Sequence, residues 1–347
     1  MDYEKLTKQS NPKAIFIAEA GINHDGSLET ARKMIDAAAD AGADYVKFQS
    51  FKADKLVTPD ALTSIYIDEG SHKGESFRDL LARLELSEDG HRDLKQYCNS
   101  KNVKFLSTAF DAESFDFLLK LGIDVVKVAS GDLTNVPLLR HLASARLPMI
   151  VSTGMASLGE IEEAVNIIIK EGNNKIVLMH CISWYPAEIK TTNLRYMETL
   201  GKAFGFPVGY SDHTLGINMS IAARALGAVV LEKHFTLDAG QFGPDHAASI
   251  EPDQMCALVR GIREVESGLG ETTRSFGDKE LGQRKVHRRS VVVKEPIKVG
   301  EVFTEVNLTI KRPGTGIKPK YWDGIIGKRA NRDINSEHLL EWLDIEF

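Results

Sequence analysis

The sequence predicts an α/β protein with a (β/α)₈ barrel, known as a TIM barrel, followed by a small β-rich domain. Apolar runs of strand length alternate with segments of helical spacing, which is the pattern of a parallel sheet. Eight such strand–helix units occupy about 250 residues, the usual size of this barrel. An open, doubly wound sheet is the alternative, but no phosphate-binding GxGxxG pattern follows the first strand.

The eight predicted strands are short apolar runs that each end in polar residues. After a polar lead-in over residues 1–13, they cover residues 14–19, 44–49, 103–108, 124–130, 148–153, 175–181, 207–211 and 228–234. Three runs follow a glycine that suits the left-handed end of a helix, at Gly42, Gly122 and Gly227. The segments between the strands have apolar residues at helical spacing, and Ser27 is the expected N-cap of the first one. A helix over residues 252–269 ends the barrel.

The character of the sequence changes after the barrel. The predicted divisions are a catalytic barrel at 1–268, a polar linker at 269–288 and a second domain at 289–347. In the second domain, Pro and Gly separate short apolar runs, which is typical of short strands and turns. These runs cover residues 290–293, 302–303 and 308–310. Residues 296–301 are weakly echoed by residues 333–337, which lack the glycine at position 300, and this echo indicates internal duplication.

Composition excludes several classes of protein. An apolar fraction of 43% and a charged fraction of 27% are ordinary for a globular protein. The net charge of −6 argues against a general nucleic-acid binder. The longest apolar runs have the length of a strand, and the charged N-terminus lacks a signal-peptide core, so we expect neither a membrane span nor secretion. Three scattered cysteines give no disulfide framework, and this pattern fits a reducing cytoplasm.

Two histidines occupy equivalent places at consecutive strand ends. His213 follows one strand and His234 ends the next, with a helical segment between them. Because parallel strands present their C-terminal ends on one side, both imidazoles should converge there with Asp212 and Glu232. Such a set suits a divalent metal with open coordination positions. The alternative is two unrelated histidines, one capping a helix and one packed under a loop.

Two lysines lie inside otherwise apolar strands, at Lys47 and Lys127. A lysine on an edge strand can deter aggregation, but a closed barrel has no edge. An inward lysine needs an anionic partner. The polar residues expected at the strand ends are Glu19, Lys47, Gln49, Ser107, Thr108, Lys127, Ser130, Ser152, Thr153, His180, Ser211, His213, Glu232 and His234. Two lysines among several hydroxyl groups indicate a site for a small phosphorylated, carboxylated ligand.

Several motifs along nearly the whole chain form one recognisable set. They are AEAGINHDG at 18–26, VKFQ at 46–49, STGM at 152–155, HC at 180–181, YP at 185–186, YSDHT at 210–214, EKHF at 232–235, GPDH at 243–246 and KRPG at 311–314. With these motifs the sequence resembles the sialic acid synthases: N-acetylneuraminate synthase and the related legionaminate and pseudaminate synthases. The C-terminal segment resembles the antifreeze-like (SAF) domain of these enzymes.

The resemblance implies an activity and roles for individual residues. Members of the family condense phosphoenolpyruvate with an N-acylated amino sugar such as N-acetylmannosamine. The resemblance assigns His213 and His234 to a divalent metal, typically manganese, and Glu19 and Glu232 to moving protons or positioning water. The residues implied to hold phosphoenolpyruvate are Lys47, Thr108, Lys127, Ser130, Ser152 and Ser211, with Gln49 beside them. Tyr185, Asp245 and Arg312 would contact the sugar, and Arg312 would act across a domain-swapped homodimer.

The expected chemistry accounts for this set of groups. A divalent metal would polarise the aldehyde oxygen of the sugar. The enol carbon then attacks the aldehyde, water adds to the cationic carbon that results, and phosphate leaves. Glu19 is the first choice of base for the water, although it could instead anchor the loop after its strand. The lysines neutralise phosphate and carboxylate throughout.

The acceptor sugar and two rival functions stay open. Residues 56–77 depart from the family pattern in a segment that should border the sugar. N-acetylmannosamine is the main expectation, and diacetamido hexoses that lead to legionaminic or pseudaminic acid are the alternative. A lysine Schiff-base aldolase would use Lys47 or Lys127 without metal. A carbohydrate-binding protein without activity would not need Glu19, Glu232 and two histidines together.

Overall fold

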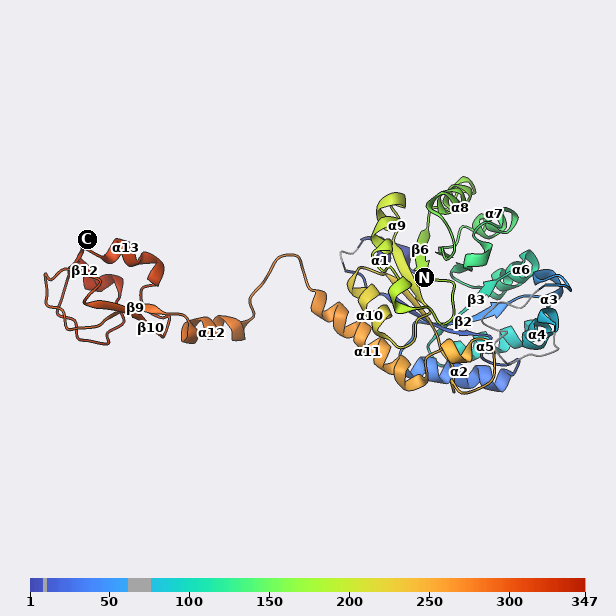
Figure 1. Cartoon of the computed structure of the whole chain (residues 1–347), viewed down its shortest axis with the longest axis horizontal. Coiled ribbons are helices and arrows are strands. Elements are labelled where there is room, and N and C mark those ends of the chain that lie inside the picture. The colour runs from blue at the N-terminus through green and yellow to red at the C-terminus, as the bar shows by residue number, and fades with distance from the viewer. Residues whose placement is uncertain (9–10, 62–75, 347) are drawn as a thin grey trace. The chain divides into compact units, whose positions relative to one another are not determined.

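The computed structural model of the chain describes residues 1–8, 11–61 and 76–346. Contacts divide the chain into two compact units, Met1–Gly270 and Glu271–Phe347. In the first unit, eight parallel strands are hydrogen-bonded in the order β3-β2-β1-β8-β7-β6-β5-β4 (Figure 1). β3 and β4, at the two ends of this order, contact each other and bring the sheet round to a nearly closed barrel. The predicted barrel is confirmed.

Each predicted barrel strand is present, with its boundaries moved by a few residues. The strands are β1 (Ile15–Gly21), β2 (Tyr45–Ser50), β3 (Lys104–Ala109), β4 (Val126–Val128), β5 (Met149–Ser152), β6 (Ile176–Cys181), β7 (Val208–Asp212) and β8 (Val230–His234). The helices around them are α2 (Leu28–Asp40), α5 (Glu88–Ser100), α6 (Ala112–Leu121), α7 (Val136–Ser144), α8 (Leu158–Lys170), α9 (Tyr196–Phe204), α10 (Asn218–Ala225) and α11 (Pro252–Leu269). Short elements in the loops are α3 (Ala53–Leu56), α4 (Phe77–Leu84), η1 (Ser130–Asp132), η2 (Ile189–Thr191) and η3 (His246–Ala248).

Alternation along each strand places polar side chains inside the barrel at one end only. In β1, Phe16 and Ala18 face the outer helices, whereas Ile17 faces the barrel interior. The next inward residue is Glu19, and β2 brings Lys47 inward in the same way above Tyr45. The lower interior is therefore apolar, and the polar groups gather at the C-terminal strand ends, where barrels carry their sites.

The N-terminal segment is not only a polar lead-in, as we expected from the sequence. Residues Tyr3–Lys8 form helix α1, whose Leu6 is buried against the apolar lower interior together with Met1 and Tyr3. The α-amino group of Met1 forms an ion pair with Asp124, just before β4. The short helix thus covers the barrel end opposite the polar groups.

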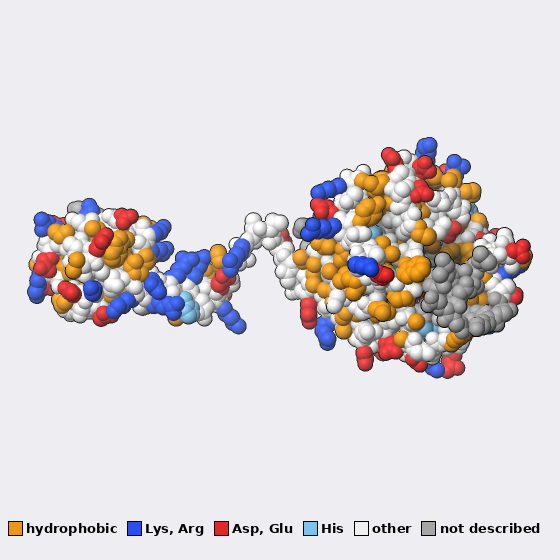
Figure 2. Space-filling view, in the orientation of Figure 1, with side chains coloured by type: hydrophobic (Ala, Val, Ile, Leu, Met, Phe, Trp, Pro, Cys, Tyr) orange, Lys and Arg blue, Asp and Glu red, His pale blue; other side chains and the backbone are white. Residues whose placement is uncertain are grey.

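The second unit is small and built from short strands. It contains α12 (Asp278–His287), β9 (Ser290–Val293), β10 (Leu308–Lys311), η4 (Pro319–Tyr321), α13 (Trp322–Ile325), β11 (Arg329–Ala330), η5 (Trp342–Asp344) and β12 (Ile345–Glu346). β9 pairs with β10, and β11 with β12, both antiparallel. Helix α12 lies in the expected linker, has no buried residue, and carries Lys and Arg side chains that gather along it in Figure 2. Val302, an expected strand residue, forms only an isolated bridge with Arg329.

The two echoed segments of the second unit pair with each other. Ile297 and Ile334 exchange backbone hydrogen bonds of 2.9 and 2.8 Å. Three residues further on, Gly300 has a φ of 82°, and Glu337, at the matching place, has a φ of 65°. The second copy therefore keeps the left-handed turn without its glycine, a conformation that costs a residue with a Cβ some strain. Over the described residues, none of the helices has the length and apolar character of a membrane span.

Candidate active site

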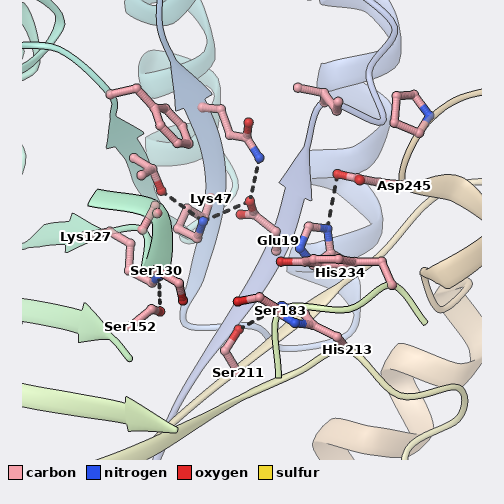
Figure 3. Close-up of a pocket in the computed structure, with 18 of the residues that line it drawn as sticks. Glu19, Lys47, Lys127, Ser130, Ser152, Ser183, Ser211, His213, His234 and Asp245 are labelled. Atoms are coloured by element: carbon pink, nitrogen blue, oxygen red, sulfur yellow. Dashed lines mark hydrogen bonds and ion pairs between the residues drawn. The ribbon is translucent and has the colours of Figure 1, made fainter. Parts of the chain in front are cut away.

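One cavity of about 500 Å³ opens at the C-terminal ends of the barrel strands. Figure 3 shows charged and hydroxyl side chains from several strands converging in it. Of the fourteen residues to which the resemblance gives a role, thirteen line this cavity: Glu19, Lys47, Gln49, Thr108, Lys127, Ser130, Ser152, Tyr185, Ser211, His213, Glu232, His234 and Asp245. The fourteenth, Arg312, belongs to the second unit, directly after β10, and its role stays a prediction.

Glu19 and Lys47 form the centre of the cavity floor. Lys47 Nζ lies 2.8 Å from Glu19 Oε1 and donates a 3.0 Å hydrogen bond to Thr108 Oγ1 (Figure 3). Gln49 Nε2 donates to the same Glu19 oxygen over 3.4 Å. The lysine in an apolar strand therefore has the anionic partner that the sequence required.

Lys127 and Glu232 form a second charged pair beside the first. Lys127 Nζ lies 3.6 Å from Glu232 Oε1 and donates a 2.7 Å hydrogen bond to Ser152 Oγ. Lys47 Nζ is 3.8 Å from the same Glu232 oxygen, so the two pairs are linked. Two buried cations next to hydroxyl groups form an anion site, provided that a ligand can compete with the carboxylates.

The two carboxylates have opposite protonation behaviour. Burial raises the pKa of Glu19 to about 7, although Lys47 opposes this. Burial also acts to raise the pKa of Glu232, but Lys127 and Lys47 outweigh it and keep that pKa below its ordinary value. For Lys127, whose charged form is the cation, burial lowers the pKa, although the negative charge of Glu232 acts to raise it. A carboxylate poised near neutral pH beside one that stays ionised is a common acid–base arrangement.

His213 and His234 lie together, as their equivalent places in the sequence predicted. Their ring centroids are 5.5 Å apart, and burial lowers the pKa of His213 to about 4 and that of His234 well below its usual value. Both imidazoles are therefore neutral at physiological pH. His213 Nδ1 is 2.6 Å from the carbonyl oxygen of Ile182, to which it donates, and this leaves Nε2 as an acceptor beside Ser211 Oγ.

Within the described residues, three buried side-chain atoms of this cavity have no hydrogen-bond partner. They are Glu19 Oε2, Glu232 Oε2 and His234 Nδ1. Asp245 Oδ2 is 3.5 Å from His234 Nδ1, and burial raises the pKa of Asp245 to about 6. Because buried polar atoms are costly when unpaired, these acceptors indicate groups meant to meet a ligand.

The two histidines fit a divalent metal as a pair of neutral imidazole ligands. No group of three or more His, Cys, Asp or Glu side chains in the described part of the chain is arranged to hold a metal ion. A metal bound here would thus leave most of its coordination positions to water and substrate, which suits a Lewis acid rather than a structural site. The ring of Tyr185 lies over His213, with centroids 4.1 Å apart, and fixes the orientation of that imidazole.

Close packing at Gly154 shapes the side of the cavity near Ser130. The backbone N–H of Gly154 donates a 3.1 Å hydrogen bond to Ser130 Oγ. A Cβ at Gly154 would lie 2.2 Å from Ser183 Oγ and 2.8 Å from Ser130 Oγ. A larger residue would therefore displace two hydroxyl groups at the cavity, which explains the glycine of the STGM motif.

Sequence reasoning missed some lining residues and misplaced others. Ser183 lines the cavity two residues beyond β6, and continued alternation from Cys181 could have indicated it. In an apolar part of the lining, Leu56, Val57 and Phe77 belong to the segment that was expected to border the sugar, whereas Leu80, Leu81, Leu84 and Phe110 were not expected. His180 and Asp212, in contrast, do not line the cavity. His180 Nε2 meets the carbonyl oxygen of Thr192 at 2.6 Å, and Asp212, which was expected beside the two histidines, pairs instead with Lys233 at 3.0 Å.

The chain is similar over almost its full length to proteins of known family. Residues 34–274 match the NeuB family, and residues 288–346 match the SAF domain. An N,N'-diacetyllegionaminic acid synthase of Campylobacter jejuni is 44% identical over 330 residues, which are 94% of this chain and 99% of the relative. The enzyme of the same name from Legionella pneumophila is 42% identical over 341 residues, 97% of this chain and 96% of the relative. A crystal structure of an N-acetylneuraminic acid synthetase from Leptospira borgpetersenii superposes with a TM-score of 0.70 at 35% identity, covering 79% of this chain and 90% of that one.

Proposed function

The chain belongs to the NeuB family and is a synthase of the sialic acid type, and we propose that it condenses phosphoenolpyruvate with a diacetamido hexose. The products are a nine-carbon keto sugar acid and phosphate, and one water molecule is consumed. The observation that carries this proposal is the floor of the cavity, where Lys47 and Lys127 pair with Glu19 and Glu232. This floor offers both an anion site and an acid–base group at one place.

Phosphoenolpyruvate fits the lysine side of the cavity. Its phosphate and carboxylate would meet Lys47 and Lys127, with hydrogen bonds from hydroxyl groups on the neighbouring strand ends. The hydroxyl groups proposed for this are those of Thr108, Ser130, Ser152 and Ser211. When the substrate binds, both lysines can pair with its phosphate and carboxylate, and they offset part of its negative charge in the buried site.

Glu19 is the proposed base. Once the enol carbon has attacked the aldehyde, the central carbon of phosphoenolpyruvate is cationic and accepts water. Glu19 Oε2, which has no hydrogen-bond partner among the described residues, is placed to take the proton from that water, and Lys47 holds the other carboxylate oxygen in place. Collapse of the tetrahedral carbon then breaks its bond to the bridging oxygen and releases phosphate. Glu232, whose pKa stays low, would remain ionised and stabilise the developing positive charge.

His213 and His234 are the proposed ligands of a divalent metal, for which manganese is our first expectation. A bound divalent ion would supply Lewis acidity at the sugar aldehyde. The chain's own part is to present two neutral imidazoles on adjacent strands, one of them held by the carbonyl oxygen of Ile182. Calorimetry with manganese checks this assignment directly. His213→Ala should abolish binding to the folded protein, and undiminished binding would refute the assignment.

The relatives favour one of the expected alternatives for the acceptor sugar. The two legionaminic acid synthases are 44% and 42% identical, whereas the N-acetylneuraminic acid synthetase is 35% identical. We therefore propose a diacetamido hexose as the acceptor in place of N-acetylmannosamine, the main expectation from the sequence. Residues 62–75 of the divergent segment 56–77 lie outside the described residues.

Arg312 is proposed to complete the site from a second copy of the chain, in a domain-swapped homodimer. The loop that carries it is firmly held within the second unit. Ser290 Oγ donates to the carbonyl oxygen of Pro313 over 2.7 Å, and Gly314 N–H donates to the carbonyl oxygen of Lys285 over 2.8 Å. A loop fixed from two sides can present a guanidinium in a defined direction, which recognition of an acyl oxygen requires.

A panel of amino sugars tests the function. Phosphate release from phosphoenolpyruvate should depend on added sugar and be fastest with a diacetamido hexose. The Schiff-base alternative predicts no need for phosphoenolpyruvate and irreversible trapping of a lysine by borohydride with pyruvate. Absence of phosphate release with every sugar would overturn the proposal and favour a binding protein.

A further inference from the structure

One part of the cavity lining is apolar, and its residues come from a single region of the barrel. We name it the apolar wall: Leu56, Val57, Phe77, Leu80, Leu81, Leu84 and Phe110. These residues lie on α3 and just after it, on α4, and just after β3. The wall belongs to the same cavity as the charged floor, so one ligand can touch both.

Packing makes the apolar wall a preformed surface. Leu80 and Leu84 are each 1% exposed and belong to a cluster with Ile22 and Phe51. The ring of Phe110 meets that of Phe51 edge to face, with centroids 6.2 Å apart. Leu56, Val57, Phe77 and Phe110 are only partly buried, and they line the cavity. The wall thus presents fixed carbon groups to whatever enters.

The chemistry at the floor determines which end of the sugar reaches the wall. The aldehyde carbon must meet the enol carbon near Lys47, Lys127 and the histidines. The N-acyl group next to the aldehyde stays close to that reacting end. The substituents farthest from the aldehyde are therefore the ones left to face the lining beyond the floor, of which the apolar wall forms a large part.

We propose that the apolar wall selects the acceptor, by binding a second acyl methyl group or a deoxy carbon where a common hexosamine carries hydroxyl groups. This inference rests on the proposed function, because it assumes that an amino sugar occupies the cavity. A hydroxyl group pressed against these side chains would lose its hydrogen bonds to water without replacement, which disfavours its binding there. A methyl group gains free energy from the same contact.

The size of the selection follows from its apolar character. A hydrophobic surface distinguishes a methyl group from a hydroxyl group only by about 10- to 200-fold, far less than a site built on hydrogen bonds can achieve. The parent enzyme should therefore prefer a diacetamido deoxyhexose over N-acetylmannosamine by a ratio of kcat/KM in this range. Slow turnover of N-acetylmannosamine should remain measurable.

Val57→Thr tests the wall directly, because it exchanges a methyl group for a hydroxyl group with almost no change in shape. The ratio of kcat/KM for the diacetamido deoxyhexose to that for N-acetylmannosamine should fall several-fold. Leu56→Gln, at the neighbouring position, should lower the same ratio. Val306→Thr is the matched control: Val306 is 68% exposed in the second unit, and its substitution should leave the ratio unchanged.

The outcomes separate this inference from the proposed function. Affinity for phosphoenolpyruvate, measured by calorimetry, should equal that of the parent in both wall variants and so confirms that their floor is intact. If the parent releases phosphate with an amino sugar, but both wall variants keep the parent's ratio, the wall does not select and the inference is wrong. If the parent releases no phosphate with any sugar, the proposed function itself fails.

Discussion

Glu19 and Glu232 lie on the neighbouring strands β1 and β8, and their pKa values differ because their charged neighbours differ. Glu19 is buried and meets one lysine at 2.8 Å, whereas Glu232 lies within 4 Å of both Lys47 and Lys127. Burial dominates at Glu19 and raises its pKa to about 7, while the two cations hold the pKa of Glu232 low. The environment thus gives the proposed base and the proposed electrostatic stabiliser separate roles, although the side chains are chemically identical.

The pKa of Glu19 predicts an acid limit for catalysis. The proposed base must be ionised, so kcat/KM for phosphoenolpyruvate should fall as pH drops below about 7, approaching tenfold per pH unit. Above pH 7, kcat/KM should become constant. The phosphate of the substrate also titrates, near pH 6, so its contribution to the pH dependence of kcat/KM must be measured separately. The affinity of Glu19→Gln for phosphoenolpyruvate, measured over the same pH range, gives that contribution.

A flat kcat/KM profile from pH 8 to pH 5, after that correction, would contradict the role of Glu19 as base. A fall of kcat/KM below pH 7 that only follows the pH dependence of phosphoenolpyruvate binding to Glu19→Gln would also contradict this role, because the titrating group would then be the substrate.

At the scale of elements, a buried ion pair joins the ends of β7 and β8 behind the two histidines. Asp212 and Lys233 pair in register on the outer side of these strands, with Lys233 Nζ 3.0 Å from Asp212 Oδ2 and neither side chain exposed. Asp212 also accepts hydrogen bonds from the backbone N–H and hydroxyl of Thr214 and from Ser220. Each residue directly precedes a histidine, so this ion pair fixes the two strand ends that present His213 and His234.

Loss of this ion pair should be costly. Lys233→Met leaves Asp212 charged and buried, and we expect the free energy of unfolding to fall by about 3–5 kcal/mol. The matched control is Lys202→Met, which breaks the exposed pair with Glu198 and should change the free energy of unfolding far less. Urea unfolding followed by circular dichroism measures both. Equal stability of the two variants would show that the Asp212–Lys233 pair does not hold the strand ends.

The sequence predicted those features that depend on short-range pattern. Gly122 ends α6 with a φ of 85°, as its place before a strand indicated, and alternation along β7 and β8 brought His213 and His234 together. Features that depend on the closed barrel were missed. Leu6 has only Met1 and Tyr3 near it in an otherwise polar segment, and the barrel interior gives it a place to be buried.

The apolar wall was predicted only in part: residues 56–77 were expected to border the sugar, but Leu80, Leu81, Leu84 and Phe110 were not expected to line the cavity. The spacing of Leu80, Leu81 and Leu84 predicts only that one face of α4 is buried. Other side chains of this region line the cavity because α3 and α4 pack over the barrel end. No local sequence pattern encodes that packing. In the second unit, the positive φ of Glu337 could be inferred only by matching it to Gly300.

At the scale of the whole molecule, the account predicts that activity is shared between chains. Glu19→Ala and Arg312→Ala should each be nearly inactive alone. A mixed dimer should contain one site with both residues intact, so activity should return when subunits exchange. Glu19→Ala mixed with Lys127→Met is the control: both changes lie in the barrel, and every site of a mixed dimer lacks one group. If exchange is demonstrated and only background activity appears in the first mixture, Arg312 does not act across subunits.

The central claim is that the cavity joins phosphoenolpyruvate to a sugar by adding water to carbon, and the fate of the water oxygen tests it most directly. The reaction is run in water enriched in heavy oxygen, with a diacetamido hexose as acceptor, and the released phosphate is analysed by mass spectrometry. The account predicts phosphate without heavy oxygen, because its bridging oxygen leaves with phosphorus when the carbon–oxygen bond breaks. Heavy oxygen in the phosphate would show that water attacks phosphorus, and this result would contradict the roles proposed here for Glu19 and the two lysines.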